Sequence, residues 1–81
     1  MITFGAALEM DDNGGDCRIV IQVGGSKTAF QDASAARRVG EELVSSDDFN
    51  ATERELFAML KSMIDAAALS FERVTRQSNS H

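Results

Sequence analysis

Cysteine and histidine are scarce in this sequence, with one of each among 81 residues, and proline, tryptophan and tyrosine are absent. The single cysteine, Cys17, excludes an intramolecular disulfide and therefore the stapled scaffold of many small secreted proteins. Zinc sites need three or four Cys or His ligands at close spacing, so we expect no metal site. Cys17 also lacks a histidine within reach for nucleophilic catalysis, because His81 lies in the polar stretch that ends the sequence.

Targeting and membrane signals are missing as well. Residues 1–5 lack the basic segment and the long apolar run of a signal peptide. No segment approaches the length of a membrane span. The sequence therefore predicts a cytoplasmic protein that has no membrane partner.

Positive charge is in short supply, since eight Lys and Arg residues against 13 Asp and Glu residues give a net charge of −5. Proteins that bind phosphate backbones need clustered basic residues. Arg37 and Arg38 are the one adjacent basic pair, and each has a glutamate four residues further on. The sequence therefore predicts no direct binding to nucleic acid, and its acidity suits a partner with a basic surface.

Length and composition are those of one small globular domain, with 43% hydrophobic and 26% charged residues. We expect a single α+β domain over residues 1–76 and a polar, flexible tail over residues 77–81. A domain of this size buries only about 60% of its unfolded surface. Its core is therefore thin, and a partner or a second copy would add to its stability.

Alternating hydrophobicity predicts three strands in the first 31 residues. Residues 2–10 and 17–23 alternate with period two, and residues 26–31 return after Gly24-Gly25, a two-residue hairpin signal. Residues 11–16 have the composition of a turn. The apolar stripes share one face of an antiparallel sheet in only one register, which pairs Met10 with Cys17, Leu8 with Ile19, Ala6 with Ile21, Val23 with Ser26, Ile21 with Thr28 and Ile19 with Phe30.

Helical periodicity follows the strands. Asp32 can cap a first helix whose apolar stripe is Ala36, Val39, Gly40, Leu43 and Val44. Gly40 within that stripe predicts close packing against a neighbouring element, and the Arg37–Glu41 and Arg38–Glu42 spacings predict ion pairs on the opposite side. A capping box from Thr52 to Glu55 predicts a long second helix over about residues 53–75. The fold class is thus α+β: a three-stranded antiparallel meander followed by two helices packed on one face (β-β-β-α-α), in two layers.

Two short segments resemble ligand-binding motifs, and neither fits its pattern. Residues 24–28 (GGSKT) contain two glycines, but a phosphate-binding loop needs glycine at the positions that Ser26 and Ile21 occupy here. A hairpin turn explains the segment. Asp11, Asn13 and Asp16 surround Gly14 but depart from the calcium-loop spacing. No base is positioned for a serine nucleophile. The sequence therefore predicts a protein that is not an enzyme, with no catalytic residues and no cofactor.

Two surfaces are unusual and supply the candidate partner-binding residues. The first is acidic: Glu9, Asp11, Asp12 and Asp16 crowd the first turn, and Asp47, Asp48 and Glu53 crowd the loop before the long helix. The second is apolar: the long helix carries an apolar arc wider than one packing face needs, and Met59, Met63 and Leu69 lie at or beyond its margins. Methionine suits adaptable interfaces.

In size and charge the chain resembles small phage or mobile-element accessory proteins, including inhibitors of host nucleic-acid-binding defence complexes. That resemblance implies an anti-CRISPR-like inhibitor or decoy. We therefore expect a non-enzymatic, acidic protein-binding module that occupies a basic nucleic-acid-binding surface of a larger protein complex. The alternative is a small structural, self-assembling protein that forms a homodimer through the long C-terminal helix or a sheet edge.

Overall fold

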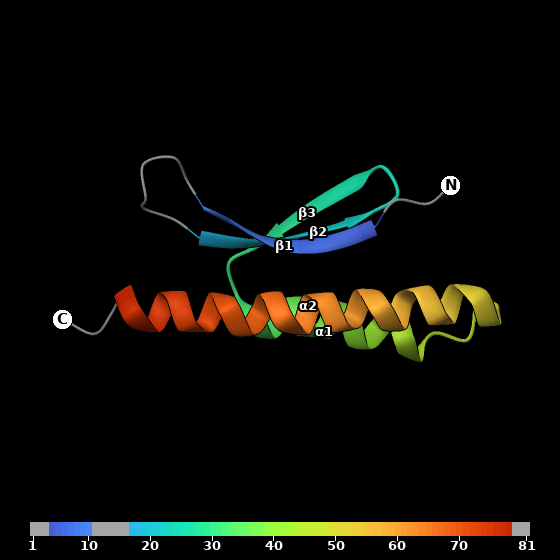
Figure 1. Cartoon of the computed structure of the whole chain (residues 1–81). Coiled ribbons are helices and arrows are strands. Elements are labelled where there is room, and N and C mark those ends of the chain that lie inside the picture. Colours follow the sequence, from blue (N-terminus) through green and yellow to red (C-terminus); the bar gives the residue numbers. More distant parts are fainter. Residues whose placement is uncertain (1–3, 11–16, 79–81) are drawn as a thin grey trace.

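The computed structural model describes residues 4–10 and 17–78, and it confirms the expected α+β meander. The strands are β1 (Phe4–Met10), β2 (Cys17–Val23) and β3 (Ser26–Phe30), and the helices are α1 (Ala33–Ser45) and α2 (Ala51–Ser78). The strands form one antiparallel sheet in the order β1-β2-β3. Both helices lie on the same side of this sheet, so the protein has two layers (Figure 1).

The register is the one that the apolar stripes predict. Leu8 pairs with Ile19 across β1 and β2, and Ile19 pairs with Phe30 across β2 and β3. The turn between β2 and β3 consists of Gly24 and Gly25, and only Gly24 has a positive φ, of 61°. A positive φ at the first central residue alone is the pattern of a type II′ turn, which suits the twist of a hairpin. Gly24 is therefore the glycine on which the turn depends.

The core lies between the sheet and the two helices. Ile19 and Ile21 supply it from the middle strand, which is the most buried of the three. The helices contribute the remaining buried apolar residues, Ala33, Ala36, Phe57, Leu60, Ile64, Ala67, Ala68 and Phe71. Cys17 is half-buried and packs against this cluster, as its strand position predicts. Within the described residues, no buried side-chain nitrogen or oxygen lacks a hydrogen-bond partner.

Helix α1 begins and packs as its sequence indicates. The Asp32 carboxylate accepts a hydrogen bond from the Ser34 amide at 2.9 Å and caps the helix. Gly40 is buried against α2, where a β-carbon on it would lie 3.1 Å from Lys61 Cγ. The predicted close approach of this helix to its neighbour is therefore confirmed. Val44 is the exception in the stripe, because it is exposed.

The predicted capping box at Thr52 and Glu55 is wrong, because α2 begins two residues earlier. Asn50 is the capping residue: its side chain accepts from the Glu53 amide at 2.9 Å, and its amide donates to the Glu53 carboxylate at 3.1 Å. An asparagine caps as well as a threonine. The Phe49 ring packs edge-on against Phe57 at 4.5 Å, which holds the chain where Asn50 can cap.

The predicted ion pair between Arg37 and Glu41 is also wrong. Arg37 reaches across to α2 and donates to both carboxylate oxygens of Glu72, with Nη1 at 3.2 Å from Oε2. These hydrogen bonds lower the pKa of Glu72 below its ordinary value. Arg38 and Glu42 form no ion pair with each other in the part of the chain that the structure describes. Arg37 therefore serves the contact between the two helices and not the surface of α1.

Helix α2 sets the length of the molecule. Its 28 residues span about 42 Å, whereas the seven residues of β1 span about 24 Å. The longest dimension of the molecule is 48 Å, and α2 extends past the sheet at both ends (Figure 1). Over residues 4–10 and 17–78, no helix combines the length and apolar character needed to cross a bilayer.

Candidate functional site

Strand β1 has an open edge. It is the outermost strand, and no other strand of the described chain pairs with its outer side. Val23 and Ser26 flank the two-residue turn, and such flanking residues form a hydrogen-bonded pair. Hydrogen-bonded and non-hydrogen-bonded pairs alternate along an antiparallel ladder. Counting back through the register, the β1 residues whose backbone N–H and C=O groups point away from β2 are Phe4, Ala6, Leu8 and Met10.

The other edge of the sheet is better protected against pairing. Strand β3 has five residues, of which Ser26, Lys27 and Thr28 are polar and exposed. Short strands and lysines are two devices by which proteins discourage contacts at a sheet edge. Strand β1 has seven residues and one charged side chain, that of Glu9. The less protected edge of the sheet is therefore that of β1.

One flank of α2 extends this open edge with apolar side chains. Met59 is 60% exposed and Met63 is 40% exposed. At about 100° per residue, Ala66 and Ser70 continue the same flank toward the end of the helix, and both are exposed. Among these four residues, the two large side chains (Met59 and Met63) thus come first along the helix and the two small ones (Ala66 and Ser70) follow.

A shallow groove of about 330 Å³ runs between the β1 edge and this flank. Its lining comes from the middle of β1 and from α2: Ala6, Ala7, Leu8, Met63, Ala66, Ala67 and Ser70. We call this surface the β1–α2 groove. It is open and contains no charged side chain, and the small residues Ala66 and Ser70 leave room for the side chain of a partner.

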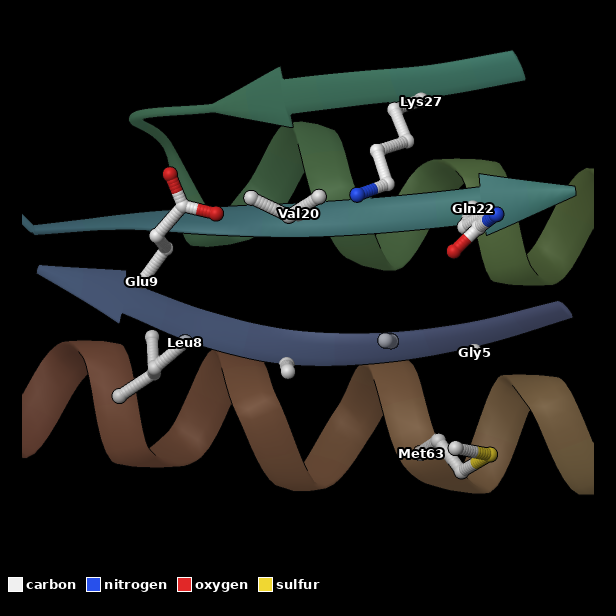
Figure 2. Close-up of a pocket in the computed structure, with 9 residues that line it drawn as sticks. Gly5, Leu8, Glu9, Val20, Gln22, Lys27 and Met63 are labelled. Atoms are coloured by element: carbon white, nitrogen blue, oxygen red, sulfur yellow. The ribbon is translucent and has the colours of Figure 1, made fainter. Parts of the chain in front are cut away.

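Met63 lies where this groove meets a second hollow, on the outer face of the sheet (Figure 2). A β-carbon on Gly5 would lie 3.6 Å from the Met63 methyl, so Met63 reaches round the edge of β1. The hollow has a volume of about 360 Å³, and Glu9, Gln22 and Lys27 line it beside the small residues of β1. Methionine has three rotatable bonds and can move aside for a partner at modest cost.

The structure separates the predicted binding residues into groups. Met59 and Met63 share the flank beside β1, whereas Leu69 is 47% exposed on a different side of α2 and lines neither hollow. Glu9 lies on the outer face of the sheet and pairs with Arg18 at 3.1 Å. Its carboxylate therefore already has a basic partner within the sheet.

The acidic residues do not form one surface in the described chain. Asp11, Asp12 and Asp16 lie outside the described residues. Glu53 takes part in the cap of α2: its carboxylate accepts a hydrogen bond from the Asn50 amide, and its own amide donates to the Asn50 side chain. Asp47 and Asp48 are exposed in the loop between the helices, where Asp47 lies 3.5 Å from Arg54. In the described ranges, no group of three or more Asp, Glu, Cys or His residues could hold a metal ion.

Sequence reasoning missed the small residues of the site. Ala7, Ala66 and Ser70 line the groove, but small side chains carry little signal in a hydrophobic pattern. Only the meeting of β1 with α2 gives them a role. The one available hint was that Met59 and Met63 lie on an apolar arc wider than a single packing face needs.

No family model, curated protein or solved structure matches this chain. Function is therefore inferred from the surface itself.

Proposed function

We propose that the protein is a non-enzymatic protein-binding module whose binding surface is the β1–α2 groove together with the open edge of β1. The observation that carries this proposal is the placement of a largely apolar seven-residue edge strand, whose outer side pairs with no other described strand, directly beside the exposed Met63, with the exposed Met59 one turn further along the same flank of α2. Isolated exposed apolar residues are ordinary, but a contiguous apolar surface with free backbone groups marks an interaction site.

The surface offers a partner two kinds of contact. Backbone groups at the edge of β1 can donate and accept hydrogen bonds, which add affinity with little dependence on the partner's sequence. The groove supplies shape, because a large apolar side chain can fill the space over Ala66 and Ser70. Met59 and Met63 then adapt to the partner's surface.

Capture experiments with single substitutions test this surface. Ala7→Lys and Ala66→Glu each place a charge in the groove, and both residues are exposed, so the fold should persist. Tagged protein is incubated with host lysate and an untagged copy of the chain, and the retained proteins are identified by mass spectrometry. We expect both variants to lose whatever the wild type retains.

Matched controls carry the same changes away from the groove. Ala29→Lys alters the exposed outer face of β3, and Ala58→Glu alters the polar side of α2. Both controls should retain the wild-type partners. Equal retention by all four variants would mean that binding uses another surface.

A second candidate function is an acidic inhibitor or decoy for a basic nucleic-acid-binding surface. Asp47 and Asp48 favour it, because the Asp47 side chain is 99% exposed and Asp48 is exposed beside it, in a chain of net charge −5. Such a complex should survive nuclease and weaken steeply with added salt.

Charge reversals separate this candidate from the groove. Changing Asp47 and Asp48 together to Lys should abolish capture of a basic partner, as should reversal of the acidic first turn. Changing Glu41 and Glu42 of α1 to Lys alters the net charge by the same amount and should leave capture intact. Equal loss in both pairs would show that only overall charge matters.

A further inference from the structure

We propose that the occupant of the β1–α2 surface is a second copy of this chain, which packs its α2 antiparallel against the first α2 about a two-fold axis. This inference rests on the proposed function, because it names the partner of that same surface. It is carried by the order of large and small residues along the exposed flank, together with the charges at the two ends of the flank.

The flank is self-complementary when it is read in both directions. Its positions recur at alternating spacings of three and four residues, as in helices that pack at a shallow angle, and they are Leu56, Met59, Met63, Ala66, Ser70 and Arg73. A two-fold axis between Ile64 and Asp65 maps this series onto itself. Met63 then faces the partner's Ala66, and Met59 faces the partner's Ser70.

Each exposed methionine thereby meets a small side chain of the partner. Ala66 and Ser70 give the partner's methionines room, and their small size lets the two helices approach closely. Parallel packing would instead place Met63 against the partner's Met63 and leave a gap at Ser70. The sequence of the flank thus selects the antiparallel arrangement, which is isologous and closes as a dimer.

Charges at the ends of the flank agree with the same axis. Glu55 and Arg73 are both exposed, and neither takes part in an ion pair within the described chain. In the antiparallel arrangement Leu56 lies opposite the partner's Arg73. Glu55 is the residue before Leu56, on the side of the helix away from the sheet, and so lies close to that arginine. The two-fold axis generates this pairing twice, and opposite charges that meet in this way fix both register and direction.

The dimer also covers the groove and enlarges the core. The partner's Met63 enters the groove over Ala66, beside the middle of β1. Met59 and Met63 of both copies lose their exposure together. A domain of this length has a thin core, so burying these four methionines stabilises the fold as well as the complex.

Sedimentation equilibrium on the full chain over a wide concentration range tests the inference. We expect a reversible dimer, and Ala66→Glu should raise its dissociation constant about tenfold or more, because a carboxylate would be buried against the partner's Met63. Ala58→Glu makes the same change on the polar side of α2 and should leave the dissociation constant within about twofold. Circular dichroism of each variant checks that the fold is intact.

A charge-reversal pair tests the direction of packing. Glu55→Lys and Arg73→Glu should each raise the dissociation constant several-fold, whereas the double variant should return to within about twofold of the wild type. Additive losses in the double variant would overturn the antiparallel register.

The outcomes separate this inference from the proposed function. A wild type that stays monomeric at every concentration, while Ala66→Glu still loses a captured protein of different sequence, would overturn the second copy and keep the groove as a binding surface. A dimer unaffected by Ala66→Glu would overturn the second copy at this surface, and the proposed function would fall with it only if that variant also kept every captured protein.

Discussion

Replacement of Gly40 tests how closely α1 packs on α2. The added methyl of Gly40→Ala would lie 3.1 Å from Lys61 Cγ, and 3.6 Å from both Ile64 Cδ1 and Lys61 Cα. The two 3.6 Å distances are ordinary contacts. The 3.1 Å distance is too short, and the Lys61 stem must move by a few tenths of an ångström to relieve it.

The two effects of this substitution have opposite signs. Alanine in place of glycine inside a helix gains about 1 kcal/mol of propensity. Displacing Lys61, whose ammonium is held by Asp65 at 2.8 Å, returns part of that gain. We therefore expect Gly40→Ala to raise the free energy of unfolding by about 0.5 kcal/mol. Gly40→Leu extends further into Ile64 and the α2 backbone, and should lower it by about 3 kcal/mol.

Urea denaturation followed by circular dichroism measures these differences, at one fixed protein concentration because self-association would add to stability. In a Lys61→Ala background the crowding atom is gone, so Gly40→Ala should gain the full ~1 kcal/mol. Glu42→Leu, on the exposed side of α1, controls for bulk and should change stability by less than about 0.5 kcal/mol. A tolerated Gly40→Leu would refute the close packing of the two helices.

Three further predictions concern the turn, the cap and the bridge between helices. Gly24→Ala should cost about 1–2 kcal/mol in thermal or urea unfolding because Gly24 has a positive φ, whereas Gly25→Ala should be nearly neutral; equal effects would contradict a type II′ turn. Asn50→Ala should cost about 1 kcal/mol by losing the cap of α2, and an unchanged midpoint would place the helix start elsewhere. The pKa of Glu72 is lowered by hydrogen bonds from Arg37, so the stability that this pair adds is present above the ordinary glutamate pKa and is lost as the pH falls through the lowered value. The difference in unfolding midpoint between wild type and Glu72→Gln should therefore shrink in acid, and a difference that grew in acid would contradict the pairing.

The sheet could be predicted in detail because its signals are local and redundant. Alternation in β1 and β2 and a two-residue turn admit only one register that keeps the apolar stripes on one face, and the structure has that register. Likewise, the glycine within the apolar stripe of α1 indicated a close helix contact before its partner was known.

Competing local signals explain the errors. Asn50 and Thr52 are both good capping residues, and each has a glutamate three positions later. The contact between Phe49 and Phe57 favours the earlier start. Arg37 has an acid at the helical spacing, but its partner Glu72 lies 35 residues away in sequence. Tertiary packing decides such choices, and sequence spacing does not report it.

For the same reason, the sequence predicted the exposed methionines of the candidate site but not the groove beside them. Met59 and Met63 stand out in the sequence because they exceed the apolar arc that one packing face needs. The groove beside them exists only because α2 returns to lie along β1, the strand farthest from it in the chain.

That return of the last helix to the first strand affects how the chain is made. A ribosome adds about 5–20 residues per second and completes N-terminal elements first. Strand β1 is therefore synthesised early, and the side of it that packs on α2 stays uncovered until α2 has been synthesised. The hairpins of the meander form from neighbouring segments, whereas covering β1 requires closing almost the whole chain, the slowest kind of contact. Until α2 is made, neighbouring nascent chains would present the same uncovered strand face to one another, and such faces promote misassembly.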